Sequence, residues 1–312
     1  MVRVAAVQMR LELARSAEEY AARILLFAAR AAERGAQLVA FPEDVATALV
    51  GLLPGIDDMI AAGDLGQAVR SLGPGATVAD IFRSLAPAAG KIHEVAFSEA
   101  ARRFSIYVVA GSAVLPDARD RMVNVAQVYG PDGRRLGEQP KCHLIPMEVA
   151  WGFQTGEDLA VFDGPWGRFA APVCMDATYF ETFRILAQRG AEVVIIPSAN
   201  PEEYNWWKAL RGVWPRVQES QVYGIRSCLV GSLLGLTLTG RSGWFAPMEL
   251  TPAGDGVLAQ TDDPHGEDMV AAELDLATLR RLRTERGIHR AFNLALYEHY
   301  FPGIYRNSAA TR

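Results

Sequence analysis

The sequence has few cysteines and histidines, and neither type is spaced as it is in a metal site. Three cysteines in 312 residues, an odd and sparse set, do not make a disulfide framework and fit a reducing cytoplasm. The five histidines include no His-x-x-x-His pair, and no Cys-x-x-Cys occurs. A zinc site is therefore not indicated, and we expect neither a metal nor a cofactor.

The sequence also lacks runs of one charge and long apolar runs. The net charge is −5 and no cluster of like charges stands out, so neither nucleic acid nor an anionic membrane surface is an expected partner. The apolar stretch at residues 1–8 is too short for a signal peptide, and nothing later resembles a membrane span. We expect a cytoplasmic protein that acts on a small molecule.

What the chain does contain is a steady alternation of apolar strands and amphipathic helices. Half of its residues are hydrophobic, which is enough for a large core. Residues 2–7 predict a strand, Ser16 and Glu19 predict a capping box that opens a helix ending at Gly35, and residues 37–41 predict the next strand. This βαβ-like unit, continued along the chain, predicts one α/β domain.

Two segments are less regular. Residues 50–92 are rich in glycine, proline and alanine and predict a long excursion with one or two short helices, before a helix at 95–104. This excursion is either a flap near a site or a solvent-side insertion without functional consequence, and both interpretations stay open. Residues from 278 onward predict an arginine-rich helix followed by a polar tail.

Three apolar strands are each followed by a residue whose side chain can take part in catalysis: Glu43, Lys141 and Cys174. Each has an ordinary explanation alone, since cysteine is often a small buried hydrophobe and charged residues are usually solvated in loops. Strand ends on the same edge of a mostly parallel sheet lie together, however, so a carboxylate, an ammonium and a thiol would share one cleft.

The sequence resembles the nitrilase, or carbon–nitrogen hydrolase, superfamily through motifs in order over nearly the whole chain. Its glutamate, lysine and cysteine motifs are matched by Phe41-Pro42-Glu43, by Lys141 to Leu144 with Glu148, and by Cys174-Met-Asp176 with Phe180, Glu181 and Arg184. Later matches are Gly240 to Ser242, Pro247 and Ala272 to Asp275. The resemblance implies a four-layer α-β-β-α sandwich, usually paired into a homodimer or higher homo-oligomer. We expect one domain over residues 1–312, with an inserted segment at about 50–92 and a tail from about 284.

The resemblance also implies hydrolysis of a non-peptide carbon–nitrogen bond, most simply in a small linear amide, through a thioester on Cys174. Glu43 is the expected general base, with a pKa raised by desolvation. Lys141 and the backbone N–H of Met175 are expected to stabilise the oxyanion. Glu148 is expected to orient Lys141 or the leaving group.

Several neighbouring residues have competing interpretations. Cys142 adjoins Lys141 in an extended segment, so its side chain is expected to point the opposite way and to be structural. A Cys174–His143 dyad would follow cysteine-protease logic, but the base of this family is a carboxylate. Asp176 has the pattern of a helix cap. We expect the substrate pocket to include Asp176, Tyr179, Asn200 and Trp207, although the tryptophans at 206, 207 and 214 also suit core or dimer packing.

Some residues beside the expected substrate pocket differ from the family pattern, and these differences leave the identity of the substrate open. Phe180 stands where proline is common, and Tyr179 is an altered aromatic position. A nitrilase would carry the same three groups, but its cysteine motif more usually has Glu after an aromatic, in place of Met175-Asp176. N-carbamoyl hydrolysis and acyl transfer also use these groups. A non-catalytic member that binds a metabolite or a protein is the alternative from another class; the intact Glu43, Lys141 and Cys174 argue against it.

Overall fold

The strands form two sheet halves, joined where β1 crosses onto β9. We describe residues 1–61, 69, 73 and 75–309 of a computed structural model. The first half has the order β5 (Arg135–Pro140), β4 (Met122–Tyr129), β3 (Tyr107–Pro116), β2 (Leu38–Ala40) and β1 (Val2–Arg10), with β13 (Asp268–Leu274) antiparallel to β1.

The second half continues from β9 (Tyr223–Leu233) through β8 (Val193–Ala199) and β7 (Gly167–Ala170) to β6 (Phe162–Gly164). On its other side, β11 (Gly243–Phe245) joins β9 to β12 (Val257–Gln260), and β10 (Leu236–Leu238) folds back on β9. The junction is short: Met9 pairs with Leu229 and Arg10 with Val230. Parallel pairing of β1 with β2 and of β7, β8 and β9 places several strand ends at the same edge.

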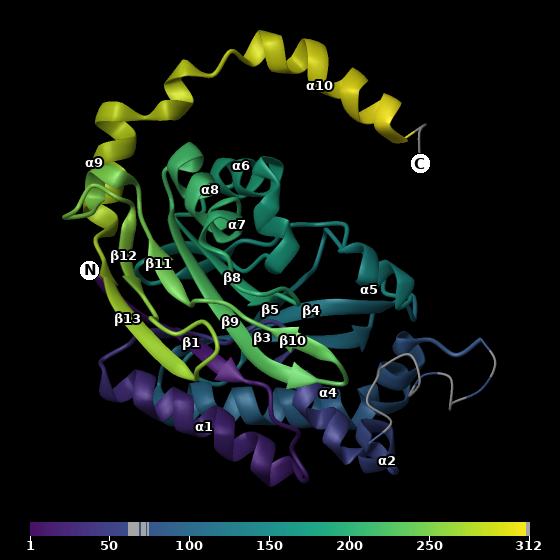
Figure 1. Cartoon of the computed structure of the whole chain (residues 1–312). Helices are drawn as coiled ribbons and strands as arrows, with labels where there is room; N and C mark the ends of the chain where they lie inside the picture. Colours follow the sequence, from purple (N-terminus) through teal and green to yellow (C-terminus); the bar gives the residue numbers. More distant parts are fainter. Residues whose placement is uncertain (62–68, 70–72, 74, 310–312) are drawn as a thin grey trace.

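Helices cover the outer face of each half. The first half carries α1 (Ala17–Glu33) and α4 (Val78–Phe104), and the second carries α6 (Phe180–Gln188) and α8 (Val213–Ser220), as Figure 1 shows. Side chains of β8 alternate between the two faces. Val193 and Ile195 join the core between the sheets, while Val194 and Ile196 pack in the helix-covered core with Phe183 of α6. These layers confirm the predicted α-β-β-α sandwich.

The predicted βαβ unit at the N-terminus is confirmed, with one change at its helix cap. Ser16 Oγ accepts a hydrogen bond from Glu19 N at 3.1 Å, as expected for an N-cap. The Glu19 carboxylate, however, accepts from the N–H of Arg15 at 2.6 Å and not from that of Ser16. The Glu19 side chain therefore binds the residue before the N-cap, whereas in a capping box it would bind the N-cap residue itself.

The helix predicted at residues 95–104 is the end of a much longer one. α4 begins at Val78, after Thr77, whose N–H donates to Asp80 Oδ2 at 2.8 Å. Pro87 lies inside this helix and weakens its sequence signal, because proline removes an intrahelical hydrogen bond. Residues 78–92 are therefore helical and not part of an irregular excursion.

Upstream of α4, the chain forms η1 (Val45–Leu52), a 3-10 helix, and α2 (Ile56–Ala61). Residues 62–68, 70–72 and 74, which the flap prediction includes, lie outside the described residues, so that prediction stays open.

The prediction of a polar tail is wrong. After α9 (Leu276–Arg286) and the short η4 (Ile288–Ala291), the chain forms α10 (Leu294–Ala309), which arches past α6 in Figure 1. α10 exposes Leu296 and Tyr300, four residues apart and thus on one face. Its inner side packs Phe301 against Phe180. Pro302 lies inside this helix, next to Gly303, and both residues weaken the helical signal of the sequence.

None of the helices in the described ranges has the length and apolarity needed to cross a membrane.

Candidate active site

Glu43 lies in the turn that follows β2 and is almost completely buried, with 1% of its surface exposed. The turn packs tightly on β3 at Gly111, where a Cβ would lie 2.0 Å from the carbonyl oxygen of Pro42 and where φ is +63°. Only glycine fits this approach. The Glu43 carboxylate is held at both oxygens: Asn124 Nδ2 donates to Oε1 at 3.0 Å, and the backbone N–H of Ala199 donates to Oε2 at 2.7 Å.

Lys141 follows β5 and is also buried, although it carries an ammonium group. Its Nζ lies 2.8 Å from Glu43 Oε1 and 2.7 Å from Glu148 Oε1. Glu148 is on α5 (Pro146–Ala150), and its second oxygen accepts from the N–H of Ile145 at 2.8 Å. Glu148 thus has the position expected of a residue that orients Lys141.

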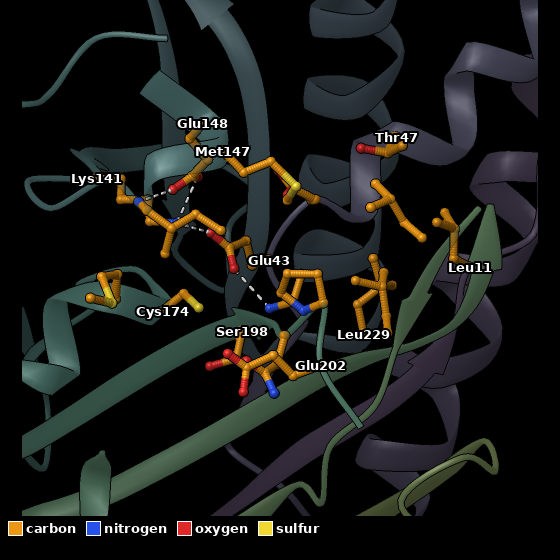
Figure 2. A pocket seen from close by; sticks show the side chains of 18 of the residues that line it. Leu11, Glu43, Thr47, Lys141, Met147, Glu148, Cys174, Ser198, Glu202 and Leu229 are labelled. Carbon is orange, nitrogen blue, oxygen red and sulfur yellow. Dashed lines mark hydrogen bonds and ion pairs between the residues drawn. The ribbon is translucent and has the colours of Figure 1, made fainter. Parts of the chain in front are cut away.

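Cys174 comes after β7, at the start of η2 (Cys174–Thr178), and is half-buried. Its φ is +44°, in the left-handed region that non-glycine residues rarely adopt and that is common at functional sites. Its thiol interacts with the Glu43 carboxyl group and with Lys141. Figure 2 shows Glu43, Lys141, Glu148 and Cys174 gathered on one side of a cavity. The structure therefore brings together the three strand-end residues and Glu148.

The electrostatics of this cluster favour a protonated thiol beside a basic carboxylate. Burial raises the pKa of Glu43. The charge of Lys141 acts to lower this pKa, and the charge of Glu148 acts to raise it. Burial also raises the pKa of the Cys174 thiol well above its usual range, with a further rise from Glu43. For Lys141, burial acts to lower the pKa, but its attraction to Glu43, Cys174 and Glu148 holds the pKa above its ordinary value. A thiol with a raised pKa needs a base in order to ionise, and the Glu43 carboxyl group lies within hydrogen-bonding reach of it.

Asp176 links the two loops that carry Lys141 and Cys174. It is fully buried and accepts from the backbone N–H groups of His143 at 2.8 Å and Val173 at 2.9 Å, and from Cys142 at 3.1 Å. His143 Nδ1 lies 2.8 Å from the same carboxylate. Asp176 is therefore a structural tie behind the site, and the structure corrects its expected place in the pocket.

The cavity has a volume of about 640 Å³ and extends well beyond the four charged and thiol groups. One wall comes from η1, α2 and β9, and another from the α4 start, β3 and α5. Both are mostly apolar. The apolar side chains that line the cavity include Leu11, which follows β1, and Val50, Ile56, Leu229, Val78, Phe82, Val114, Met147 and Trp151. Asn200 lines the cavity, as expected for the pocket, and so does Met175, whose backbone N–H is the expected oxyanion donor.

Tyr179 and Trp207 lie outside the cavity lining, contrary to expectation. Trp207 is 76% exposed on α7 (Trp206–Leu210), because the helix turns its neighbours Asn205 and Lys208 toward the cavity. Tyr179 stacks on His143, with ring centroids 4.4 Å apart. His143 bonds to Asp176, so the structure offers it no dyad with Cys174.

Cys142 also lies away from the cavity. Its Sγ is 3.3 Å from the carbonyl oxygen of Asp158, and its pKa is raised to about 12, first by burial and then by the charge of Asp176. This agrees with the structural role predicted for Cys142.

Sequence reasoning missed Asn124 and Asp44. Asn124 is a buried polar residue at the start of β4, and a polar residue inside an apolar strand pattern was the available signal. Asp44 lines the cavity next to Glu43 and had no signal beyond its charge.

Comparisons with known proteins identify the family of the chain and support the fold. Residues 3–284 match the family model described as carbon-nitrogen hydrolase. Among curated proteins, the probable hydrolase YhcX of Bacillus subtilis is 25% identical over 90% of this chain and 51% of its own length. The omega-amidase NIT2 of Bos taurus is 29% identical over 64% of this chain and 73% of its own length. The chain thus spans about half the length of the Bacillus relative.

Among solved structures, an amidase from Nesterenkonia sp. AN1 with a covalently added acetamide moiety at its active-site cysteine has a TM-score of 0.69 and 21% identity, with 96% of both chains covered. The same amidase after tag removal has a TM-score of 0.66 and 23% identity, over 93% of this chain and 99% of that one. These likenesses show the fold. Since the family model covers most of the sequence, the chain belongs to the carbon–nitrogen hydrolase family.

Proposed function

We propose that this protein hydrolyses the carbon–nitrogen bond of a linear amide through a thioester on Cys174. The observation that carries the proposal is the meeting of Glu43, Lys141 and Cys174 at one cavity, with Lys141 Nζ 2.8 Å from the Glu43 carboxylate. A thiol, a base and a cation at one point are the groups that acyl transfer requires.

In the first half of the reaction, the Cys174 sulfur attacks the amide carbon while Glu43 takes the thiol proton. Lys141, with the backbone N–H of Met175, stabilises the negative charge that develops on the carbonyl oxygen. When the carbon–nitrogen bond breaks, the protonated Glu43 gives its proton to the departing ammonia or amine. The raised pKa of Glu43 suits both roles, because a base that is also an acid works best with a pKa near the working pH.

In the second half, Glu43 takes a proton from a water molecule, which attacks the thioester carbon. The carboxylic acid leaves, and the Cys174 thiolate recovers the proton from Glu43. Glu148 holds Lys141 in place throughout, since its carboxylate lies 2.7 Å from Nζ. The names of the omega-amidase relatives and of the Nesterenkonia amidase support an amide as the substrate.

Ammonia release tests the proposal. A panel of linear amides, N-carbamoyl compounds and nitriles is incubated with the wild type, with Cys174→Ala and with Cys142→Ala as the matched thiol control. We expect ammonia from amides, no release above background by Cys174→Ala, and wild-type rates for Cys142→Ala. Preferential turnover of nitriles or carbamoyl compounds would replace the amide assignment, and binding without any turnover would favour a non-catalytic member.

We further propose a homodimer in the cytoplasm. The exposed Leu296 and Tyr300 on α10 give the chain an apolar stripe that a second copy could cover. The sparse, odd set of three cysteines also suits a reducing compartment.

A further inference from the structure

Asn124 contacts both charged groups of the proposed reaction, although no step of that reaction uses it. Its side-chain Nδ2 donates to Glu43 Oε1 at 3.0 Å, and its backbone carbonyl oxygen accepts from the N–H of Lys141 at 2.8 Å. Asn124 has 1% of its surface exposed and lies near the start of β4, where it pairs with Val114 of β3. One residue of the sheet thus sets the position of the base relative to the ammonium group.

The Asn124 side chain is oriented so that it presents a donor to Glu43. Its Oδ1 is buried and accepts no hydrogen bond from the residues that the structure describes. If the amide turned over, Oδ1 would face Glu43 Oε1, and two acceptors would repel each other. Buried acceptors without a donor are rare because they cost stability. Asparagine therefore costs stability at this position, and what the position gains is the donor to Glu43.

The contacts of the Glu43 carboxylate differ in what else they do. Lys141 Nζ, 2.8 Å from Oε1, is shared with Glu148 and also serves the oxyanion in the proposed reaction. Ala199 donates its backbone N–H to Oε2 at 2.7 Å, a contact that no side-chain substitution removes. Asn124 Nδ2 binds Oε1 beside Lys141 and has no part in the oxyanion. It is therefore the contact through which the base can be tested separately from the ammonium group.

A hydrogen bond to a carboxylate favours its charged form and so lowers its pKa. Burial raises the pKa of Glu43, and the charge of Lys141 acts to lower it. The Asn124 donor acts in the same direction as Lys141, so it keeps the buried carboxylate available as a base. The titratable groups that interact with Glu43 are Lys141, Glu148, Cys174, Asp44 and Cys228. The test below replaces none of them.

We propose that Asn124 is a positioning residue that fixes the Glu43 carboxylate beside the Cys174 thiol and holds it in its charged form. The side chains of Lys141 and Cys174 point toward this carboxylate in Figure 2. The inference rests on the proposed hydrolysis. In the alternative, Asn124 is purely structural, and its removal weakens the fold without changing the ionisation of Glu43.

Two substitutions test the position. Asn124→Leu removes the donor at nearly constant volume, and Asn124→Asp keeps the shape but places a carboxyl group beside Glu43. In Asn124→Leu, we expect kcat for an amide to fall at least about tenfold with KM within about threefold, because a misplaced base slows the chemical step. The acid limb of kcat/KM should move to higher pH by about one unit. It should move further in Asn124→Asp, since two neighbouring carboxyl groups do not ionise together.

Gln127→Met is the matched control. Gln127 is a buried amide on the same strand, and its Oε1 accepts from Tyr129 Oη at 2.8 Å. This substitution should leave kcat and the acid limb unchanged while it lowers the free energy of unfolding. An unmoved acid limb in the Asn124 variants, or an equal shift in Gln127→Met, would overturn the proposal. If Asn124→Leu does not fold, the acid limb of Asn124→Asp decides alone.

Alkylation separates this inference from the proposed activity. The rate at which iodoacetamide modifies Cys174, followed by peptide mass, requires no amide turnover and should depend on the ionisation of Glu43, which accepts the thiol proton. We expect the pH profile of this rate to shift in both Asn124 variants as that of kcat/KM does. If the wild type releases no ammonia but the alkylation profile shifts, the amide hydrolysis fails and the positioning stands. If ammonia is released and neither profile shifts, the positioning fails alone.

Discussion

At the scale of single residues, the site depends on one ammonium shared by two buried carboxylates. Lys141 Nζ lies within 2.8 Å of Glu43 and 2.7 Å of Glu148, and all three side chains are almost fully buried. Removing one partner from a buried ion pair is strongly destabilising, because the other charge loses both its partner and its water. Lys141, which we propose supports the oxyanion, thus also holds the site together.

Lys141→Met should therefore damage both activity and stability. We expect kcat to fall by about 10²–10³ through the lost oxyanion donor. The free energy of unfolding should fall by about 3–5 kcal/mol, as measured by denaturant titration. Lys91→Met is the control, since Lys91 pairs with Glu94 on the exposed surface, and it should change stability by less than about 0.5 kcal/mol. Wild-type turnover by Lys141→Met would show that the ammonium is not needed.

The raised pKa of Glu43 predicts the pH dependence of the reaction. The base must be deprotonated, so kcat/KM should rise with pH through the pKa of Glu43. Because burial raises this pKa, the acid limb of the profile should lie above the value of about 4.3 typical of an exposed glutamate. A profile that stays flat down to about pH 4.3 would contradict the desolvated base.

At the scale of elements, helix register decides which aromatic residues reach the cavity. α7 presents Lys208 to the cavity and turns Trp207 to solvent, whereas Trp151, at the end of α5, lines the cavity and packs against Phe153. A tryptophan cluster in the sequence therefore does not by itself indicate an acyl pocket.

This difference gives a paired test. Trp151→Ala should lower kcat/KM for amides with long acyl chains by roughly tenfold or more, because a lost apolar contact in a pocket is worth about 1–3 kcal/mol. Trp207→Ala should leave the dependence of kcat/KM on acyl length unchanged. A changed profile in Trp207→Ala with an unchanged one in Trp151→Ala would reverse the assignment of the pocket wall.

At the scale of the whole molecule, α10 leaves an apolar stripe without cover. Leu296 and Tyr300 are exposed, while Phe301 and Tyr305 attach the helix to α6 through Phe180 and Glu181. Exposed apolar stripes of this kind commonly mark protein interfaces.

The dimer proposal predicts that this stripe controls assembly. The wild type should run as a dimer in size-exclusion chromatography with light scattering, and the double substitution Leu296→Ser with Tyr300→Ser should shift it toward the monomer. Glu298→Ser, an exposed residue of the same helix, should leave the dimer intact. A monomeric wild type would refute the proposal.

The whole-molecule comparison also shows how far the sequence predicts this structure. Glu43, Lys141 and Cys174 could be placed together because each ends an apolar strand, and strand ends share an edge. The α-β-β-α layers followed from the family resemblance. The left-handed backbone of Asp44, with φ 55°, was out of reach, because most residues avoid this conformation.

Asp176 could not be placed either, because the backbone N–H groups of Cys142 and His143 that bind it come from a loop more than thirty residues away. The start of α4 is hidden in the sequence by Pro87, and the helix α10 by Pro302. Local sequence patterns therefore predict where strands end. They do not predict the orientation of a side chain or the length of a helix where tertiary contacts determine it.

The most direct measurement is the mass of the protein, quenched in acid during turnover of an amide and then digested. The account predicts an acyl group on the peptide that contains Cys174, in the wild type and in Cys142→Ala, and none in Cys174→Ala. Ammonia release with the acyl group on Cys142, or with no acylated cysteine at any quench time, would contradict it.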